Sequence, residues 1–553
     1  MNKKIQDLIE QSLQILSYPE VKFNVEKTKS IKFGDYSSNV ALMLKKIKPW
    51  GELKTPIQIA EEIASNINPK MFSKIEVVPP GFINFYLNDV ITKELFDCIH
   101  SQKEKYPIFE KVDQVYNVEY VSANPTGYLH IGHARNAVFG DVLAKLLSKI
   151  GINVITEYVV NDAGNQMNIL ASSVLVRYKE LFGQNITLPD DSYHGLEIIE
   201  VAKELKNKFN DAFLNVEINN DFIITNSDVR ETIRNFSRDF LLEIIKNDLA
   251  SLGVHIDIYY SEQEIHKNNL IPVTLEKLGN NVYEKDGAIW LQTTKFGDDK
   301  DRVLIKSDKT PTYFMPDIAY HDIKLNRPPK PNKLINVWGA DHYSYITRMK
   351  IALKSLGYSD DVMEVISMQM VRLMKDGSEF KMSKRSGQSL TLKDLVNTLG
   401  KDVSRWFMIS TSASTHIELD VDLALKQDNN NPIYYIEYAH ARCFSILEKT
   451  NFSYKIGQDN FSRLTLEIEK ELIGNLMNFQ NIIYNAATTY EPHKIANYVY
   501  SLAKLFHSYY GLVMINDQNN IELTNQRLSL VSAVKIILEN ALSLLGIEAY
   551  DKM

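Results

Sequence analysis

A strand-then-helix rhythm in the middle of the chain constrains the fold most. β-branched and aromatic runs at 115–122, 153–160 and 334–341 are each followed by a segment with helical apolar spacing. Strands that alternate with helices in this way pair in parallel, and the helices cover both faces of the sheet. We therefore predict an α/β fold with a Rossmann-like, doubly wound parallel sheet over 111–425, interrupted by a polar helical insertion over about 180–255.

Different patterns flank this core. Residues 1–110 combine amphipathic helical periods with strand-like runs at 74–80 and 81–87, which predicts an α+β accessory domain. Over 426–553 the strand-like runs stop, and the long segments carry apolar residues at spacings of three and four. That spacing predicts an all-α bundle.

Few cysteines and the lack of a long apolar run narrow the class of protein. Cys98 and Cys443 are the two cysteines, which is typical of a reduced compartment and excludes a cysteine-rich zinc module. We expect a cytoplasmic protein without a membrane span, because no stretch offers about 18 uninterrupted apolar residues. The net charge of −7 argues only mildly against a nucleic-acid partner, since such binding depends on local basic clusters.

A His-Ile-Gly-His cluster follows the strand predicted at 115–122. His130 and His133 are three residues apart, on one face of the first turn of the helix that follows. A doubly wound sheet binds nucleotides at this place, and imidazoles there can donate hydrogen bonds to phosphate oxygens. Gly127 shapes the turn, and Gly132 lets a base or ribose approach the backbone.

A metal site is the alternative for the histidine pair. Two histidines need further ligands, and the nearest candidates, Asp141 and Asp162, show no zinc-binding spacing. A solvated or capping pair is the plain structural alternative. We predict no metal site here.

A second motif, KMSKRSG at 381–387, favours phosphate chemistry. Lys381 and Lys384 lie on a short basic loop that ends in glycine. Two ammonium groups on such a loop suit closing over a triphosphate and neutralising the charge that develops on leaving pyrophosphate. Together the two motifs predict ATP-dependent adenylate formation.

These two motifs resemble the signatures of class I aminoacyl-tRNA synthetases, and the longer runs resemble the arginyl-tRNA synthetase family. In chain order, the runs are VSANPTGYLHIGHARNAVFGD, YVVNDAGNQM, GADHYSYITRMK, KMSKRSG, KDVSRWFM and NPIYYIEYAHAR. The first block resembles that family's N-terminal domain through FGDYSSNVAL and PPGFINFYL. The resemblance covers nearly the whole chain.

The resemblance implies an arginine–tRNA ligase that uses ATP with Mg²⁺ to form arginyl-adenylate, and then esterifies a tRNA specific for arginine. It implies a monomer without a structural metal. His130, His133, Lys381 and Lys384 would be the catalytic residues. The implied ATP-binding residues are Gly127, His130, Gly132, His133, Asp341, His342, Lys381, Met382, Ser383 and Lys384.

Residues for binding L-arginine are implied in the same way. Glu262 and Asp317 match the family's acidic pocket, and carboxylates suit a planar guanidinium because they accept two parallel hydrogen bonds. Tyr313, four residues before Asp317 on what should be one helical face, would lie beside the guanidinium. Ser122 and Asn124 would hold the α-amino group.

The C-terminal block resembles the family's helical anticodon-binding domain. Tyr434, Tyr438 and Arg442 recur every four residues on one helix face. Aromatic rings and arginine can stack on single-stranded bases, so these residues are candidates for tRNA binding. The alternative is that the tyrosines pack the bundle and Arg442 caps a helix.

Three other functions remain to be weighed. A small-molecule nucleotidyltransferase would share the His-x-Gly-His sheet but would not need the two accessory domains. A catalytically inactive RNA-binding paralogue would not need pyrophosphate-stabilising lysines. A synthetase for leucine, isoleucine or valine would need a larger editing insertion than 180–255.

Overall fold

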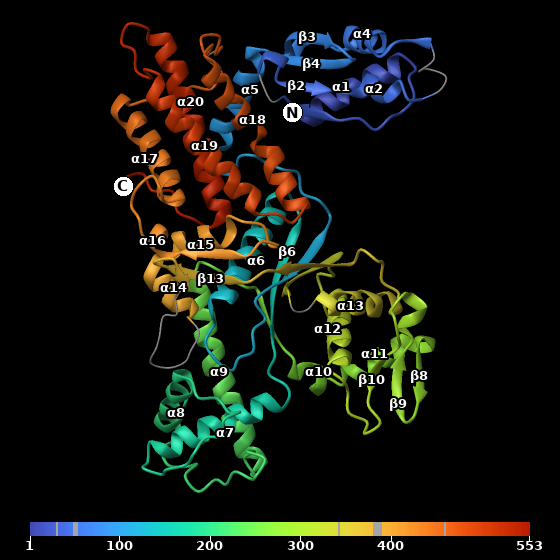
Figure 1. Cartoon of the computed structure of the whole chain (residues 1–553), viewed down its shortest axis with the longest axis vertical. Coiled ribbons are helices and arrows are strands. Elements are labelled where there is room, and N and C mark those ends of the chain that lie inside the picture. The colour runs from blue at the N-terminus through green and yellow to red at the C-terminus, as the bar shows by residue number, and fades with distance from the viewer. Residues whose placement is uncertain (29–30, 48–52, 341–342, 380–389, 458–459) are drawn as a thin grey trace.

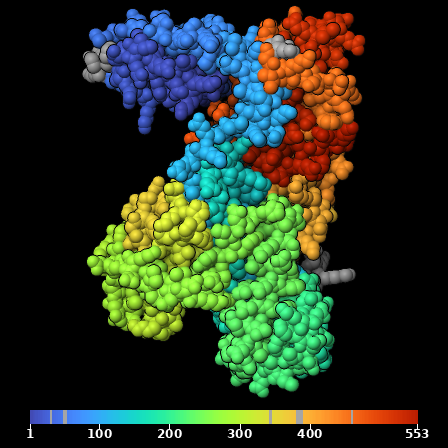
Figure 2. Space-filling model, turned by 180° about the vertical axis from the view of Figure 1, so that it is seen from behind, coloured from blue at the N-terminus to red at the C-terminus, as the bar shows by residue number. Residues whose placement is uncertain are grey.

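The computed structural model describes residues 1–28, 31–47, 53–340, 343–379, 390–457 and 460–553. The N-terminal part lies beside the C-terminal helices at one end of the molecule, and two lobes lie at the other end (Figure 1). Seen from behind, the N-terminal part projects from the C-terminal bundle, and a hollow separates the two lobes (Figure 2).

Five parallel strands form the central sheet, in the order β12-β11-β5-β6-β7. Their bounds are β5 Val115–Glu119, β6 Asn153–Val160, β7 Ile258–Ser261, β11 Lys333–Gly339 and β12 Met363–Met368. The chain enters at β5, runs outward through β6 and β7, and returns to β11 on the other side of β5. This order confirms the predicted doubly wound sheet, and the strand order reverses between β5 and β11.

Helix α6 (Ile131–Lys149) joins β5 to β6 and packs against the sheet through buried apolar side chains. Gly140 permits this close packing, because a Cβ atom there would lie 2.1 Å from Cγ of Tyr120. Any side chain at position 140 would push α6 away from the sheet and displace the N-terminus of the helix.

Two groups of elements interrupt the alternation of strand and helix, and they form the two lobes in Figure 1. Between β6 and β7 lie α7 (Asn165–Glu180), α8 (Leu196–Phe209) and α9 (Ser227–Ser251), which share an apolar core of their own. Between β7 and β11 lie α10 (Gln263–Lys267), α11 (Leu270–Leu278), β8 (Val282–Lys285), β9 (Ala288–Leu291), β10 (Arg302–Ile305) and α12 (Phe314–Asn326).

The remaining elements of the core follow β11 in the chain. They are α13 (Tyr343–Ser355), β13 (Val371–Lys375), β14 (Ser378–Glu379), α14 (Leu392–Leu399), α15 (Lys401–Ile409), β15 (Ile417–Asp420) and α16 (Val421–Ala424). Strand β13 pairs with β15 in parallel and with β14 in antiparallel fashion, so the chain forms a small three-stranded sheet before it enters the C-terminal helices.

The N-terminal part is an antiparallel sheet covered by helices, as the α+β pattern predicts. Its strands lie in the order β1-β2-β4-β3 and pack on helices with a separate apolar core. The bounds are α1 Asn2–Ile15, β1 Val25–Lys27, β2 Tyr36–Ser38, α2 Val40–Leu44, α4 Pro56–Asn66, β3 Phe72–Val78, β4 Phe82–Leu87 and α5 Asp89–Gln102.

Four long helices form the C-terminal bundle, which confirms the all-α prediction. They are α17 (Pro432–Thr450), α18 (Glu467–Thr488), α19 (His493–Leu512) and α20 (Ile521–Leu545). By length and composition, α20 is the one helix of the described residues that could cross a membrane. However, 72% of its most apolar window is buried inside the protein, as in the core helix of a bundle.

Candidate active site

The turn between β5 and α6 lies at the point where the strand order reverses. Val121 and Ser122 both have positive φ angles, 69° and 40°, so β5 ends at Glu119, short of the predicted 122. Asn136 of α6 holds this turn: its Oδ1 accepts from the Val121 N–H at 2.7 Å, and its Nδ2 donates to the Val337 carbonyl of β11 at 3.0 Å. Left-handed backbone at two successive non-glycine residues is typical of functional sites that the surrounding structure holds in place.

The two histidines of the cluster pack against one another at the N-terminus of α6. Their ring centroids are 3.7 Å apart at 24°. Nδ1 of His130 accepts from the Gly132 N–H at 3.0 Å, and Nδ1 of His133 accepts from the His130 N–H at 3.2 Å. Because each Nδ1 is an acceptor, the proton of each neutral ring is on Nε2, which is left as a donor.

Both histidine rings are neutral at physiological pH. Burial lowers the pKa of His130, and burial together with the neighbouring His130 lowers the pKa of His133 to about 3. The pair therefore offers two directed N–H donors and no net charge. Gly132 makes room for this arrangement, because a Cβ atom there would lie 2.9 Å from Cε1 of His130.

The segment that follows the KMSKRSG motif reaches the histidine turn. Ile131 N–H donates to the Leu390 carbonyl at 3.2 Å, and Leu392 N–H donates to the Leu129 carbonyl at 2.7 Å. The stretch 390–392, far from the histidine turn in sequence, is therefore joined to it through the backbone. The predicted residues Asp341, His342, Lys381, Met382, Ser383 and Lys384 lie outside the described residues.

Asp317, the predicted acidic residue on α12, is a poorly solvated carboxyl group. Burial, together with the nearby charges of Glu262 and Glu119, raises its pKa to about 7, although a hydrogen bond from Tyr345 opposes the rise. Burial also raises the pKa of Glu262, and the charge of Asp162 contributes to this rise. Glu119 has a local cation, since Lys324 Nζ lies 2.7 Å from it. A cationic ligand at Asp317 and Glu262 would relieve their mutual repulsion.

Tyr313 stays a predicted contact of the guanidinium, but it is not the tyrosine that contacts Asp317 in this structure. Tyr313 is the N-cap of α12, and its side chain is 91% exposed. Instead, the Tyr345 hydroxyl of α13 donates to Asp317. No sequence spacing relates α13 to Asp317, so the sequence alone does not indicate Tyr345 as its partner.

Ser122 and Asn124, the predicted contacts of the α-amino group, are already used within the protein. Ser122 Oγ donates to Glu119 and accepts from the Val159 N–H, both at 3.1 Å. Asn124 Oδ1 accepts from Asn161 at 3.0 Å, and Asn124 Nδ2 donates to Gln166 at 3.1 Å. Each carbonyl oxygen has two lone pairs, so Asn124 Oδ1 can still accept from an ammonium.

The C-terminal candidates lie together on α17, half-buried and bonded to one another. Arg442 lies between two rings, with its guanidinium carbon 4.4 Å from the centroids of both Tyr438 and Tyr510. It also donates to the Tyr438 hydroxyl at 2.8 Å and lies 3.0 Å from His507. Tyr434 stacks on Tyr438. In this conformation the faces of Arg442 are occupied, so stacking on a base would require the cluster to open.

Three known families match consecutive parts of the chain. The Arginyl tRNA synthetase N terminal domain matches residues 3–87, and the catalytic domain of tRNA synthetases class I (R) matches residues 96–409, which is more than half of the chain. The DALR anticodon binding domain matches residues 436–553.

Similar proteins cover the whole length. An arginine–tRNA ligase from Ureaplasma parvum serovar 3 is 48% identical over 534 residues, which are 97% of this chain and 96% of that protein. The Bacillus subtilis ligase is 42% identical over 546 residues, 97% and 95% of the two chains. A solved arginyl-tRNA synthetase from Thermus thermophilus covers 100% of both chains with a TM-score of 0.76 at 21% identity, and so shows the same fold. The chain belongs to the arginyl-tRNA synthetase family.

Proposed function

We propose that the chain ligates L-arginine to its tRNA, using ATP and releasing AMP and pyrophosphate. One observation carries the assignment: the poorly solvated carboxyl groups of Asp317 and Glu262 lie close enough for their charges to interact, and Glu262 and the neutral histidine pair both follow the carboxyl ends of strands in the doubly wound sheet. Carboxylates there fit a guanidinium, and N–H donors there fit phosphate oxygens.

In the first step, an oxygen of the arginine carboxylate attacks the α-phosphorus of ATP, and the bond to the bridging oxygen of pyrophosphate breaks. His130 and His133 would donate from Nε2 to phosphate oxygens, while Lys381 and Lys384 would neutralise the leaving pyrophosphate. In the second step, the terminal ribose hydroxyl of the tRNA attacks the arginyl carbonyl, and its proton passes to a phosphate oxygen of the departing AMP. The bond to the AMP phosphate oxygen then breaks.

Asp317 and Glu262 would bind the guanidinium, and Asn124 would accept from the α-amino group. Mg²⁺ would arrive with ATP, because this ion is held mainly by substrate phosphates and water and helps to neutralise them. No group of three or more His, Cys, Asp or Glu within the described ranges could hold a metal ion. We further propose a cytoplasmic monomer that acts without a membrane.

Arginine-dependent exchange of pyrophosphate into ATP, measured with and without the arginine-accepting tRNA, tests the assignment. We expect exchange with arginine in the presence of tRNA. Absence of exchange under both conditions would refute the assignment, and exchange with another amino acid would reassign the pocket. A small-molecule nucleotidyltransferase would give arginine-independent turnover, and an inactive paralogue would bind tRNA alone.

The affinity for arginine is expected to rise with pH across neutrality. The pKa of Asp317 is about 7 in the free protein, and a guanidinium binds the ionised carboxylate. About a tenth of Asp317 is ionised at pH 6 and about nine tenths at pH 8, so the Kd for arginine should fall about tenfold. Calorimetry in two buffers of different ionisation enthalpy should detect proton release at pH 6.5. A flat profile without proton release would contradict this.

A further inference from the structure

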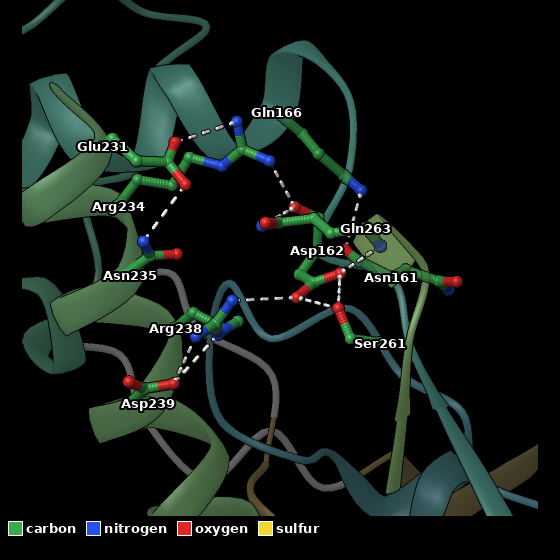
Figure 3. Close-up of polar contacts among 10 residues, drawn as sticks. All are labelled: Asn161, Asp162, Gln166, Glu231, Arg234, Asn235, Arg238, Asp239, Ser261 and Gln263. Carbon is green, nitrogen blue, oxygen red and sulfur yellow. Dashed lines mark hydrogen bonds and ion pairs between the residues drawn. The ribbon is translucent and has the colours of Figure 1, made fainter. Parts of the chain in front are cut away.

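A buried aspartate outside the proposed reaction joins the insertion helices to the arginine pocket. Asp162 is the second residue after the end of β6, and its side chain is 0% exposed. Figure 3 shows it at the centre of a polar network, with Arg234 and Arg238 reaching it from α9. A buried carboxylate is stable only when opposite charge and hydrogen bonds compensate the loss of water. The network around Asp162 supplies both.

The carboxylate of Asp162 binds the residues on both sides of Glu262. Ser261 Oγ lies 2.7 and 2.9 Å from the two carboxylate oxygens, and the Gln263 N–H donates to Oδ1 at 3.1 Å. The Glu262 N–H donates to the Val160 carbonyl at 3.0 Å. The backbone that carries the proposed guanidinium ligand is therefore held at three successive residues.

Two arginines of α9 hold Asp162 from the other side. Arg238 Nη1 donates to Asp162 Oδ2 at 3.1 Å, and Arg234 Nη2 donates to its main-chain carbonyl at 2.7 Å. They are four residues apart and so share one face of the helix. That carbonyl also accepts from Gln263 Nε2 at 3.1 Å, so both arginines bind the same unit that holds Glu262.

The end of β6 also contacts Asn124, the proposed ligand of the α-amino group. Asn161 donates to Asn124 Oδ1 at 3.0 Å, and its carbonyl lies 3.5 Å from Gln166 Nε2. Fixing Asp162 therefore fixes its neighbour Asn161, and with it Asn124. The loop after β6 connects contacts proposed for both ends of the arginine molecule.

We propose that Arg238 and Arg234 are positioning residues for substrate arginine, which act through Asp162 to hold Glu262 and Asn124 in their binding geometry. This inference rests on the proposed role of Glu262 and Asn124. Arg238 also places a positive charge against Asp162, and this charge partly offsets the repulsion between Asp162 and Glu262.

Replacing Arg238 by glutamine in the full-length protein tests the proposal. We expect KM for arginine to rise about tenfold or more, since displacement of binding groups by about 1 Å has effects of that size, and KM for ATP to stay within about twofold. Arg238→Lys keeps the charge and a donor nitrogen, and should recover most of the loss. Calorimetric titration with L-arginine should show the tightest binding for the wild type, weaker binding for Arg238→Lys and the weakest binding for Arg238→Gln.

Arg230→Gln is the matched control. Arg230 is on the same helix but donates to the Ile224 carbonyl at 3.0 Å, within the insertion. If Arg230→Gln and Arg238→Gln raise KM for arginine equally, or Arg238→Gln raises the two KM values in parallel, the positioning role is refuted. If the wild type neither binds nor uses arginine, the proposed function fails first, and the inference fails with it.

Ser261→Ala provides a milder variant in case Arg238→Gln does not fold, which circular dichroism would reveal. It removes one hydroxyl from the carboxylate of Asp162 and leaves both arginines in place. We expect KM for arginine to rise about threefold, as for loss of one hydrogen bond. An unchanged KM for arginine in this variant would also overturn the proposal.

Discussion

Replacing Asp317 by asparagine is expected to lower kcat/KM for arginine by about a hundredfold and to change KM for ATP by less than about twofold. The guanidinium would lose an ionic partner in a site where burial weakens solvation of both charges. The amide also presents N–H donors to a ligand that only donates. Steady-state exchange kinetics with each substrate varied in turn would measure the two effects.

A matched substitution on the same helix separates this effect from damage to α12. Asp322 is buried, binds Lys277 at 2.5 Å and accepts from the Tyr358 hydroxyl at 2.6 Å, away from Glu262. Asp322→Asn should leave KM for arginine near the wild-type value. Equal losses for arginine and ATP in Asp317→Asn would indicate a structural aspartate.

The stability of Asp317→Asn distinguishes it from an ordinary core defect. The pKa of about 7 in the folded chain lies above the pKa of an unfolded aspartate, so the ionised group costs folding free energy. This cost is absent at low pH and grows as the pH rises to about 7. Because asparagine removes it, the variant should unfold at pH 8 at a urea concentration no lower than the wild type.

Local patterns predicted the elements but not the contacts between distant ones. The run at 153–160 matches β6 because it is apolar, β-branched and bounded by turn residues. The histidine pair could be found because its spacing matches one helical turn. By contrast, Asn136 bonds to Val337, 201 residues away, and no local pattern specifies such a partner.

The two tyrosines near Asp317 in sequence and in space show the same limit at a shorter range. A spacing of four predicted that Tyr313 would face Asp317, but α12 begins at Phe314 and leaves Tyr313 exposed. The phenol that reaches Asp317 comes from Tyr345 on another helix. Choosing between the two tyrosines required the packing of α12 against α13, which depends on the whole lobe.

Replacing Arg405 by methionine is expected to lower the free energy of unfolding by about 3–5 kcal/mol. Arg405 lies in the KDVSRWFM run and is 0% exposed. It donates to Asp141 of α6 at 2.5 Å, to the Leu252 carbonyl after α9 at 2.9 Å, and to the Leu545 carbonyl at the end of α20 at 2.7 Å. One guanidinium thus joins the core, the insertion and the C-terminal bundle.

The large effect follows from what the substitution leaves behind. Within the part of the chain that the structure describes, Asp141 would keep only Lys145, at 2.7 Å. Two buried helix-end carbonyls would also lose a donor. Arg463→Met is the control, since its pair with Glu522 is about half exposed on both sides and, being screened by solvent, should contribute little to stability. Urea unfolding followed by circular dichroism would measure both variants. Similar midpoints for the two would contradict the proposed importance of the buried pair.

Removing the aspartate together with the arginine separates the cost of an unpaired charge from the contribution of the pair itself. In Asp141→Leu/Arg405→Met, no buried charge remains unpaired between these positions, so the double variant should be more stable than Arg405→Met alone. The two carbonyls would still lack their donor, so recovery should be incomplete. Additive losses would show that Asp141 and Arg405 stabilise the chain independently. A coupled result would mean that α6, which presents the histidine pair, is held in place by the same charge pair that anchors the C-terminal bundle.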